Sequence, residues 1–308
     1  MTQGQRRAGT REQAMPSEAR RGHLAMLLFS MLVAGSFSLG AQVANQIAPT
    51  ALNALRFSVA TGLIGALVMA RGGVPRAALR APWRYLAMGG LFAIYFVLMF
   101  EGLKTALPVS AAAVFTMTPV LAAGFGWVLM RQVMTRRMAG ALTIGATGAL
   151  WVIFRADPAA LLAFRIGSGE LIYLAGVTAH AFYTPLVRRL NRGESALVFT
   201  FGTLIGGAVL LIAFGWADLR ATDWGALPGL VWVTIAYTSV FATAVTFVLV
   251  QFATLRLPAA KVMAYTYLVP SWVIGWEVAM GNGVPPLLVL AGVGLTALAL
   301  VMLLKDEG

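Results

Sequence analysis

The sequence is poor in charged residues and contains no cysteine. Only 11% of its 308 residues are Asp, Glu, Lys or Arg, and 59% are hydrophobic, whereas charged residues make up about 25% of soluble domains. The lack of cysteine excludes disulfides, a thiol nucleophile and thiolate metal sites. With only two histidines, His23 and His180, a histidine-rich metal site is excluded as well. We therefore expect neither a metal nor any other cofactor.

Acidic residues are scarce beside basic ones. There are 11 Asp and Glu against 23 Lys and Arg, which gives a net charge of +12. A nucleic-acid-binding protein could show the same balance. Here, however, the basic residues form short groups between apolar runs, which is typical of membrane topology. The sequence thus predicts the lipid bilayer, and not nucleic acid, as a partner.

The apolar runs recur at the length needed to cross a bilayer, about 20 residues. They predict an all-α integral membrane protein with ten transmembrane helices. We place these spans at residues 24–44, 51–70, 83–104, 108–130, 137–154, 168–187, 196–215, 227–254, 258–280 and 286–304. Residues 1–22 are polar and rich in Arg, and we expect a disordered basic cytoplasmic tail there.

The basic residues predict an orientation for these spans. Seventeen of the 23 fall on one side of the predicted helices, four on the other, and Arg56 and Lys261 lie inside spans. Basic loops stay in the cytoplasm, so both termini are expected to be cytoplasmic. An odd number of spans would destroy this asymmetry. The pattern predicts a multi-pass protein of the cell inner (plasma) membrane.

An internal repeat relates the two halves of the chain. Pro119 in the fourth span and Pro270 in the ninth share an offset of 151 residues, and Gly124 and Gly275 match at the same offset. We predict two five-helix repeats, 23–155 and 166–304. Because five spans separate the matching positions, the second half enters the membrane from the opposite side. Inverted repeats of this kind build many secondary transporters.

Short motifs give the chain a family resemblance. They are Ala54-Leu55-Arg56-Phe57 at the start of the second span, Thr118-Pro119-Val120 in the fourth, and Leu268-Val269-Pro270 in the ninth. With these motifs the chain resembles the EamA-type drug/metabolite transporters over residues 23–304. Within that superfamily it is most similar to the YddG-type exporters of aromatic and other neutral amino acids. The resemblance implies a ten-helix inverted-repeat fold and a small-molecule substrate.

Ionisable residues within spans are costly and therefore informative. Arg56, Glu101 and Glu277 lie at matching depths, so we predict a buried ion pair between Arg56 and one of the two carboxylates. Such a pair could fix helix packing or take part in gating. Lys261 is expected either to extend to the interface or to receive a substrate carboxylate. His180, in the middle of its span, could pack structurally or line a cavity.

A central cavity is predicted from residues near mid-depth. Pro119, Pro185 and Pro270 lie inside spans, where proline kinks a helix and frees a carbonyl. Gly202 and Gly206 have the spacing of close helix contacts. Aromatic, hydroxyl and other side chains at this depth could form the cavity wall or merely pack between helices. The predicted cavity residues are Tyr95, Met99, Phe115, Thr116, His180, Tyr183, Ser239, Thr243, Lys261, Tyr265, Tyr267 and Trp272.

These residues favour a transporter over other membrane proteins. A mostly apolar pocket with a few hydroxyls suits neutral or zwitterionic metabolites, above all aromatic and other hydrophobic amino acids. Export of drugs or lipophilic cations is the alternative, although such substrates favour an acid at mid-depth. A membrane-embedded enzyme needs a carboxylate pair, metal ligands or a nucleophile with its base, and a channel needs charge rings or a filter motif. We expect a monomer or weak homodimer without catalytic residues.

The predicted topology can be tested with reporter fusions. Fusions after Arg137 and Arg192 should report a cytoplasmic location, and fusions after Asp157 and Asp223 a periplasmic one, because the basic loops stay inside. Alkaline phosphatase and green fluorescent protein give complementary signals for the two compartments. A reversed signal at any one of these four sites would contradict the count of ten spans.

Overall fold

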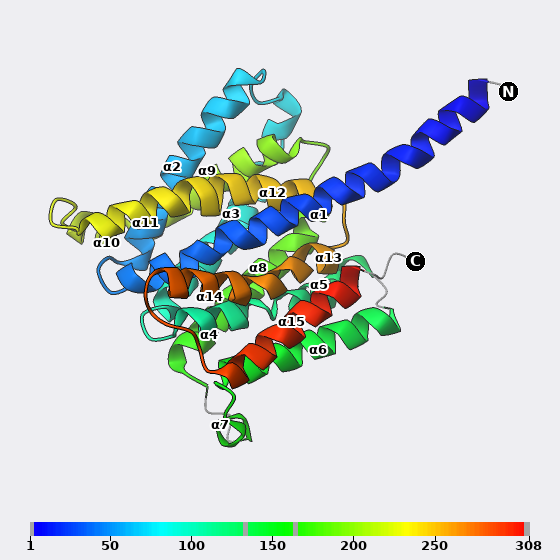
Figure 1. The fold of residues 1–308 in the computed structure, drawn as a ribbon. Helices are drawn as coiled ribbons and strands as arrows, with labels where there is room; N and C mark the ends of the chain where they lie inside the picture. Colours follow the sequence, from blue (N-terminus) through cyan, green and yellow to red (C-terminus); the bar gives the residue numbers. More distant parts are fainter. Residues whose placement is uncertain (1–2, 132–134, 163–165, 305–308) are drawn as a thin grey trace.

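The fold is a bundle of helices, seen here in a computed structural model that describes residues 3–131, 135–162 and 166–304 (Figure 1). These residues contain no β-strand. The helical elements are α1 (Gln3–Val43), α2 (Pro49–Ala70), η1 (Arg76–Leu79), α3 (Trp83–Gly102), α4 (Pro108–Phe115), α5 (Thr118–Met130), α6 (Arg136–Ile153), α7 (Pro158–Leu162), α8 (Ser168–Leu190), α9 (Ala196–Phe214), α10 (Trp216–Ala221), α11 (Gly229–Ser239), η2 (Val240–Val245), α12 (Thr246–Thr254), α13 (Ala259–Ala264), η3 (Tyr265–Leu268), α14 (Val269–Ala279) and α15 (Leu287–Leu304).

Seven helical segments among the described residues are long and apolar enough to cross a membrane. They are Glu18–Val43, Pro49–Ala70, Trp83–Gly102, Pro108–Met130, Ala196–Phe214, Gly229–Thr254 and Leu287–Leu304. The other three predicted spans coincide with α6, α8 and the broken α13–η3–α14 segment. The all-helical class is therefore confirmed, while a total of ten spans stays a prediction.

The first helix begins earlier than the sequence predicts. α1 continues outward from its span to Gln3 and projects beyond the bundle (Figure 1). The expectation of a disordered tail over residues 1–22 is thus not met from Gln3 onward. A span supplies the costly helix nucleus, and the Ala, Arg, Gln and Glu residues that precede it favour extension of the helix, whereas Pro16 opposes it.

Both chain ends lie at the same end of the bundle. In Figure 1 the N and C labels are at the right, whereas α10 is at the left and α7 is at the bottom, both away from the two labels. We call the end with the termini the proximal end and the other the distal end. The helices consequently alternate in direction, as the short connections between the predicted spans require.

Helix breaks occur at matching places in the two halves. α4 ends at Phe115, and α5 begins after a two-residue turn with Pro119 in its first turn. In the second half, η3 separates α13 from α14, whose first turn holds Pro270. Proline is favoured in a first helical turn because its missing N–H has no partner to lose there. By contrast, α8 runs through Pro185 without interruption.

Helix pairing follows the same two-half relation. α3 packs on α8 and α1 on α12; likewise α5 packs on α8 and α1 on α14. Each predicted span has a counterpart five spans away: α8 for α1, α12 for α3 and α14 for α5. If every helix is replaced by its counterpart, the α3–α8 pair becomes the α12–α1 pair, and the α5–α8 pair becomes the α14–α1 pair. Three further pairs, α2 with α9, α5 with α13 and α6 with α15, map onto themselves. The bundle thus has the contacts of a pseudo-two-fold arrangement.

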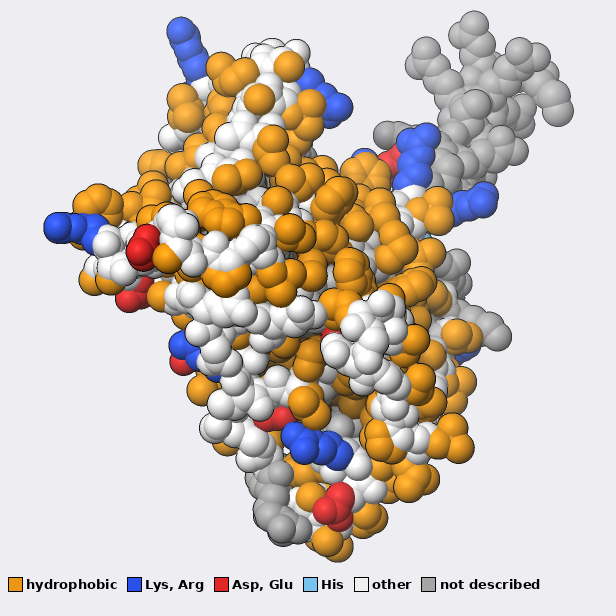
Figure 2. All heavy atoms as spheres, turned by 60° about the vertical axis from the view of Figure 1, so that its left-hand side comes forward, with side chains coloured by type: hydrophobic (Ala, Val, Ile, Leu, Met, Phe, Trp, Pro, Cys, Tyr) orange, Lys and Arg blue, Asp and Glu red, His pale blue; other side chains and the backbone are white. Residues whose placement is uncertain are grey.

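The surface between the ends is mainly apolar. Figure 2 shows hydrophobic side chains over most of one face, with Lys and Arg in separate groups. At the proximal end, the buried Arg84 guanidinium donates to Glu194 at 2.7 Å and also to the Leu190 carbonyl at the end of α8. Burial opposes ionisation of Glu194, but hydrogen bonds from Arg84 and the Arg192 backbone lower its pKa overall.

Glycines allow α3 and α9 to approach closely. A Cβ atom at Gly89 would overlap the backbone of Gly207 and Thr203, and one at Gly206 would overlap the backbone of Tyr85. A Cβ at Gly202 would overlap the Tyr85 ring. The prediction that Gly202 and Gly206 mediate a close helix contact is confirmed.

This contact predicts a selective effect of a single methyl group. Gly89→Ala should lower the unfolding free energy by about 1–3 kcal/mol, because the added methyl must push two backbones apart. Gly62→Ala in α2 is the matched control, since a Cβ there meets nothing within 4 Å. Thermal unfolding in detergent, followed by tryptophan fluorescence, measures both variants. Equal midpoints for the two variants would contradict close packing at Gly89.

Candidate functional site

A cluster of aromatic side chains fills the centre of the bundle. The His180 ring lies 4.6 Å from Tyr95, 5.3 Å from Phe115 and 5.4 Å from Phe92, measured between ring centroids. Tyr183 adds a contact at 4.1 Å to Phe92. Four residues predicted from the sequence, Tyr95, Phe115, His180 and Tyr183, thus come together through α3, α4 and α8.

The cluster joins the two halves of the chain and is tightly closed. Phe247 of α12 stacks on Phe92 at 3.9 Å. The space that remains between these rings has a volume of about 10 Å³, roughly that of one water probe. A bulky molecule can enter the centre only if these rings separate.

Polar atoms in this centre lack complete hydrogen bonding. Nδ1 of His180 is buried and has no partner among the described residues, and the same holds for Oε1 of Gln251. The amide nitrogen of Gln251 donates to the Tyr183 hydroxyl. A buried polar group without a partner costs about 1–3 kcal/mol. Such groups in a closed aromatic centre are available to a ligand.

Arg56 lies beside the cluster as a fully buried cation. Its guanidinium contacts the Phe96 ring at 3.7 Å, a cation–π geometry. Nη2 donates to the Ala242 carbonyl at 2.8 Å, and Nε donates to the Thr243 hydroxyl. Both acceptors belong to η2, a π-helical turn, and π-helical turns are frequent at functional sites.

The predicted ion pair of Arg56 is not formed. No ion pair within the described ranges joins Arg56 to Glu101 or to Glu277. Glu101 pairs instead with Lys104 at 2.7 Å, and Glu277 accepts from Asn282 at 2.9 Å. Lys104 is one helical turn from Glu101 and reaches it without being buried. Arg56 therefore has uncharged partners only, including Asn53 at 3.5 Å.

Several other predicted cavity residues lie away from the centre. Trp272 is 38% exposed and donates to Ser30 from the outer side of the bundle. Tyr267 is buried against Gly145 of α6, and its carbonyl accepts from Thr296 of α15. Spacing along α14 and η3 fixes their depth in the membrane but not the direction in which they point. Neither residue contributes to the central cluster.

The remaining predicted residues differ in role. Met99, Thr116 and Ser239 are fully buried, and the Thr116 hydroxyl donates to the Ala113 carbonyl of α4. Thr243 holds Arg56. Lys261 is half-buried in α13.

A buried carboxylate escaped the sequence analysis. Glu170 in the first turn of α8 is 5% exposed and accepts a hydrogen bond of 2.8 Å from Ser110 of α4. It lies at the start of the predicted span 168–187 and was not among the ionisable residues singled out from the sequence. The close contact of Gly102 with Gly169, which brings α3 against α8, is the reason it is buried. The additional aromatic residues Phe92, Phe96 and Phe247 were missed because Phe in a span is as common facing lipid as facing a site.

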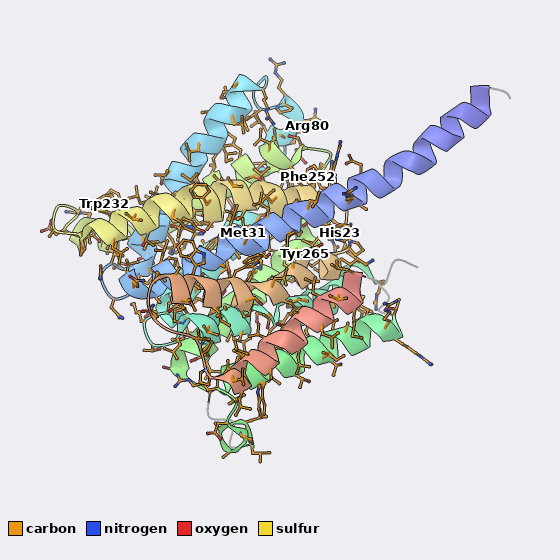
Figure 3. All side chains as sticks on the ribbon, viewed as in Figure 1. His23, Met31, Arg80, Trp232, Phe252 and Tyr265 are labelled. Atoms are coloured by element: carbon orange, nitrogen blue, oxygen red, sulfur yellow. The ribbon has the colours of Figure 1, made fainter. Side chains whose placement is uncertain are left out.

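The proximal end is closed by contacts of α1. The Tyr265 hydroxyl lies 3.1 Å from Nδ1 of His23, and Figure 3 shows these two side chains meeting between α1 and η3. Glu18 accepts from Arg256 at 2.7 Å one turn further out. These contacts join α1 to the second half of the chain at the end where both termini lie.

The distal end, in contrast, is hollow. A cavity of about 630 Å³ opens between α1, α4, α6, α14 and α15. Its lining is mostly apolar, and it includes the side chains of Ser38, Gln42, Ser110, Arg155, Glu277 and Asn282. Among the described residues, the contacts that join α1 to the second half thus lie at the proximal end, and this cavity lies at the distal end.

Comparisons with known proteins agree with this architecture. The chain is 25% identical over 292 residues to a Bacillus subtilis (strain 168) protein described as the uncharacterized transporter YyaM, which covers 92% of this chain and 95% of that protein. A solved crystal structure superimposes with a TM-score of 0.71 at 21% identity, over 93% of this chain and 97% of the other, a likeness in fold alone. The EamA-like transporter family matches residues 20–154 and 167–305. The chain belongs to the EamA-like transporter family, and it is a multi-pass membrane transporter.

Proposed function

We propose that the protein is a secondary transporter that exports small zwitterionic metabolites, above all aromatic and other hydrophobic amino acids, across the inner membrane. Transport proceeds by alternating access through the central aromatic cluster. In this proposal the two halves, 23–155 and 166–304, are inverted repeats, and the proximal end faces the cytoplasm. The YddG-type exporters suggested by the sequence resemblance are the corresponding subfamily.

The observation that carries the proposal is the composition of the centre. Rings from both halves meet there, and the polar groups among them, His180 and Gln251, have unused hydrogen-bonding capacity. Aromatic faces bind an aromatic or aliphatic side chain, and a few convergent polar groups orient it. The closed rings would have to part around a substrate, as a transport cycle requires.

Charge at the centre supports zwitterions over cations. Arg56 is buried beside Phe96 with uncharged partners only. A charge in a low-dielectric site is stabilised strongly by an opposite charge, so a substrate carboxylate is favoured there and a lipophilic cation is repelled. Export of drugs or lipophilic cations remains the second candidate, favoured by the aromatic walls alone.

The arrangement of the helices supports alternating access. Helix pairs related by the exchange of halves, and matching breaks before Pro119 and Pro270, fit an inverted repeat. The contact of α1 with η3 at the proximal end and the cavity at the distal end fit a conformation open to the far side of the membrane. The exchanged arrangement would close the distal cavity and open the proximal end.

Counterflow in proteoliposomes tests the substrate class. Vesicles loaded with unlabelled L-phenylalanine should accumulate labelled L-phenylalanine transiently. Vesicles loaded with a cationic dye or a nucleoside should not accumulate the labelled form of the compound they contain. Accumulation with the dye alone would replace the proposal by its alternative.

The same vesicles test whether transport is coupled to protons. An imposed pH gradient without a substrate gradient should drive no uphill accumulation of substrate. The sequence places no Asp or Glu near the middle of a predicted span, and Glu170 is near the distal end of α8. Uphill accumulation on a pH step would show obligatory proton coupling. Glu170→Gln would then identify whether this buried carboxylate is the carrier.

His180 provides a test of the central cluster. His180→Ala should reduce counterflow by about tenfold or more, because it removes a ring that contacts three others and the unpartnered nitrogen beside them. The purified variant should remain monodisperse. Leu171→Ala, on the same helix but 48% exposed, is the matched control and should transport normally. A loss of transport that only parallels a loss of folded protein would instead assign His180 to packing.

A further inference from the structure

The distal cavity contains one carboxylate and one guanidinium that do not pair with each other. Glu277 enters its wall from α14, and Arg155 from the turn after α6. The ion pairs of the described residues include no contact between them. The Glu277 oxygen Oε2 accepts from Asn282, whereas Oε1 is buried and has no partner. A carboxylate and a guanidinium therefore lie in the wall of one cavity, and one carboxylate oxygen has no hydrogen-bond partner among the described residues.

A second, independent feature of this wall is an unpartnered hydroxyl. Ser38 of α1 is 1% exposed, lines the cavity, and its Oγ has no hydrogen-bond partner within the part of the chain that the structure describes. A serine in a helix usually donates to a carbonyl one turn back, as Ser30 does to Leu27. Ser38 thus contributes a buried hydroxyl without a partner to the wall of this cavity.

The rest of the cavity matches an apolar side chain. Leu107, Val109, Val152, Val284 and Val289 supply apolar walls. The volume of about 630 Å³ lies within the range of small-molecule sites, about 300–1,000 Å³. An α-amino acid has an ammonium, a carboxylate and a side chain diverging from one carbon, and the cavity offers a partner for each.

We infer that the distal cavity is a binding site for a zwitterionic amino acid, distinct from the central cluster. The Glu277 carboxylate and the Ser38 hydroxyl bind the ammonium group, and the Arg155 guanidinium binds the carboxylate. This inference rests on the proposed function, because it takes the exported molecule to be an amino acid. The site holds the substrate after it has left the centre and before it is released.

Three probes that share a phenyl ring separate the two charge contacts. L-Phenylalanine carries both charges, phenethylamine only the ammonium, and 3-phenylpropionate only the carboxylate. Binding to the purified full-length protein is measured by equilibrium dialysis. The wild type should bind L-phenylalanine more tightly than either single-charge probe, since each charge-assisted hydrogen bond adds to affinity.

Each variant should lose affinity for its own pair of probes. Glu277→Gln should lower the affinity for L-phenylalanine and phenethylamine about tenfold and leave the affinity for 3-phenylpropionate unchanged. Arg155→Gln should lower the affinity for L-phenylalanine and 3-phenylpropionate and leave the affinity for phenethylamine unchanged. Asp223→Asn and Arg220→Gln are the matched controls, because both residues lie at the distal end but outside this cavity. Melting midpoints equal to that of the wild type confirm that the variants are folded.

The outcomes separate this inference from the proposed function. If the wild type shows amino-acid counterflow but the two variants bind all three probes as the wild type does, the inference is overturned and the function stands. If charge-selective binding is observed but no amino acid gives counterflow, the proposed function fails while the site remains. A wild type that does not bind L-phenylalanine overturns the inference regardless of what it transports.

Discussion

Hydrocarbon offers no hydrogen-bond partners, and this constraint shapes every polar feature of the bundle. The clearest case is Arg56, whose buried guanidinium obtains its partners from a backbone carbonyl and a hydroxyl in a π-helical turn. An ordinary α-helical turn would use its carbonyls for its own ladder, so the irregular η2 and the buried cation depend on each other. The buried side-chain atoms that have no hydrogen-bond partner among the described residues include those of His180, Gln251 and Ser38, which belong to the two candidate sites.

The two candidate sites solve the same problem differently. At the centre the rings of both halves close on one another, so the cost of exposing polar groups to an apolar medium is limited to a few atoms. At the distal end, water can reach the cavity, and charged groups such as Glu277 and Arg155 are tolerated without a mutual ion pair. A zwitterion moving between them would exchange a desolvated environment with Arg56 nearby for a hydrated one with both charges matched.

Much of the architecture follows from the sequence, because spans, breaks and loop charges are local properties. Seven long apolar spans, the break beside Pro119 and the glycine contact at Gly206 were all predictable. Partners across the bundle were not. Depth alone suggested that Arg56 meets Glu101, but pairing depends on helix rotation, and Lys104 lies closer to that carboxylate. Rotation also explains why Tyr95 and His180 face the centre, while Tyr267 and Trp272 do not.

The pairing of α6 with α15 has a consequence for how the chain is made. Gly148 and Gly292 bring these helices into backbone contact, yet 144 residues separate them in the chain. A ribosome adding about 5–20 residues per second needs roughly 7–30 s to cover that interval. For that time the glycine face of α6 has no helix to pack on and is covered by lipid or by the insertion machinery. The first half therefore cannot reach its final packing until α15 has been synthesised and has entered the membrane.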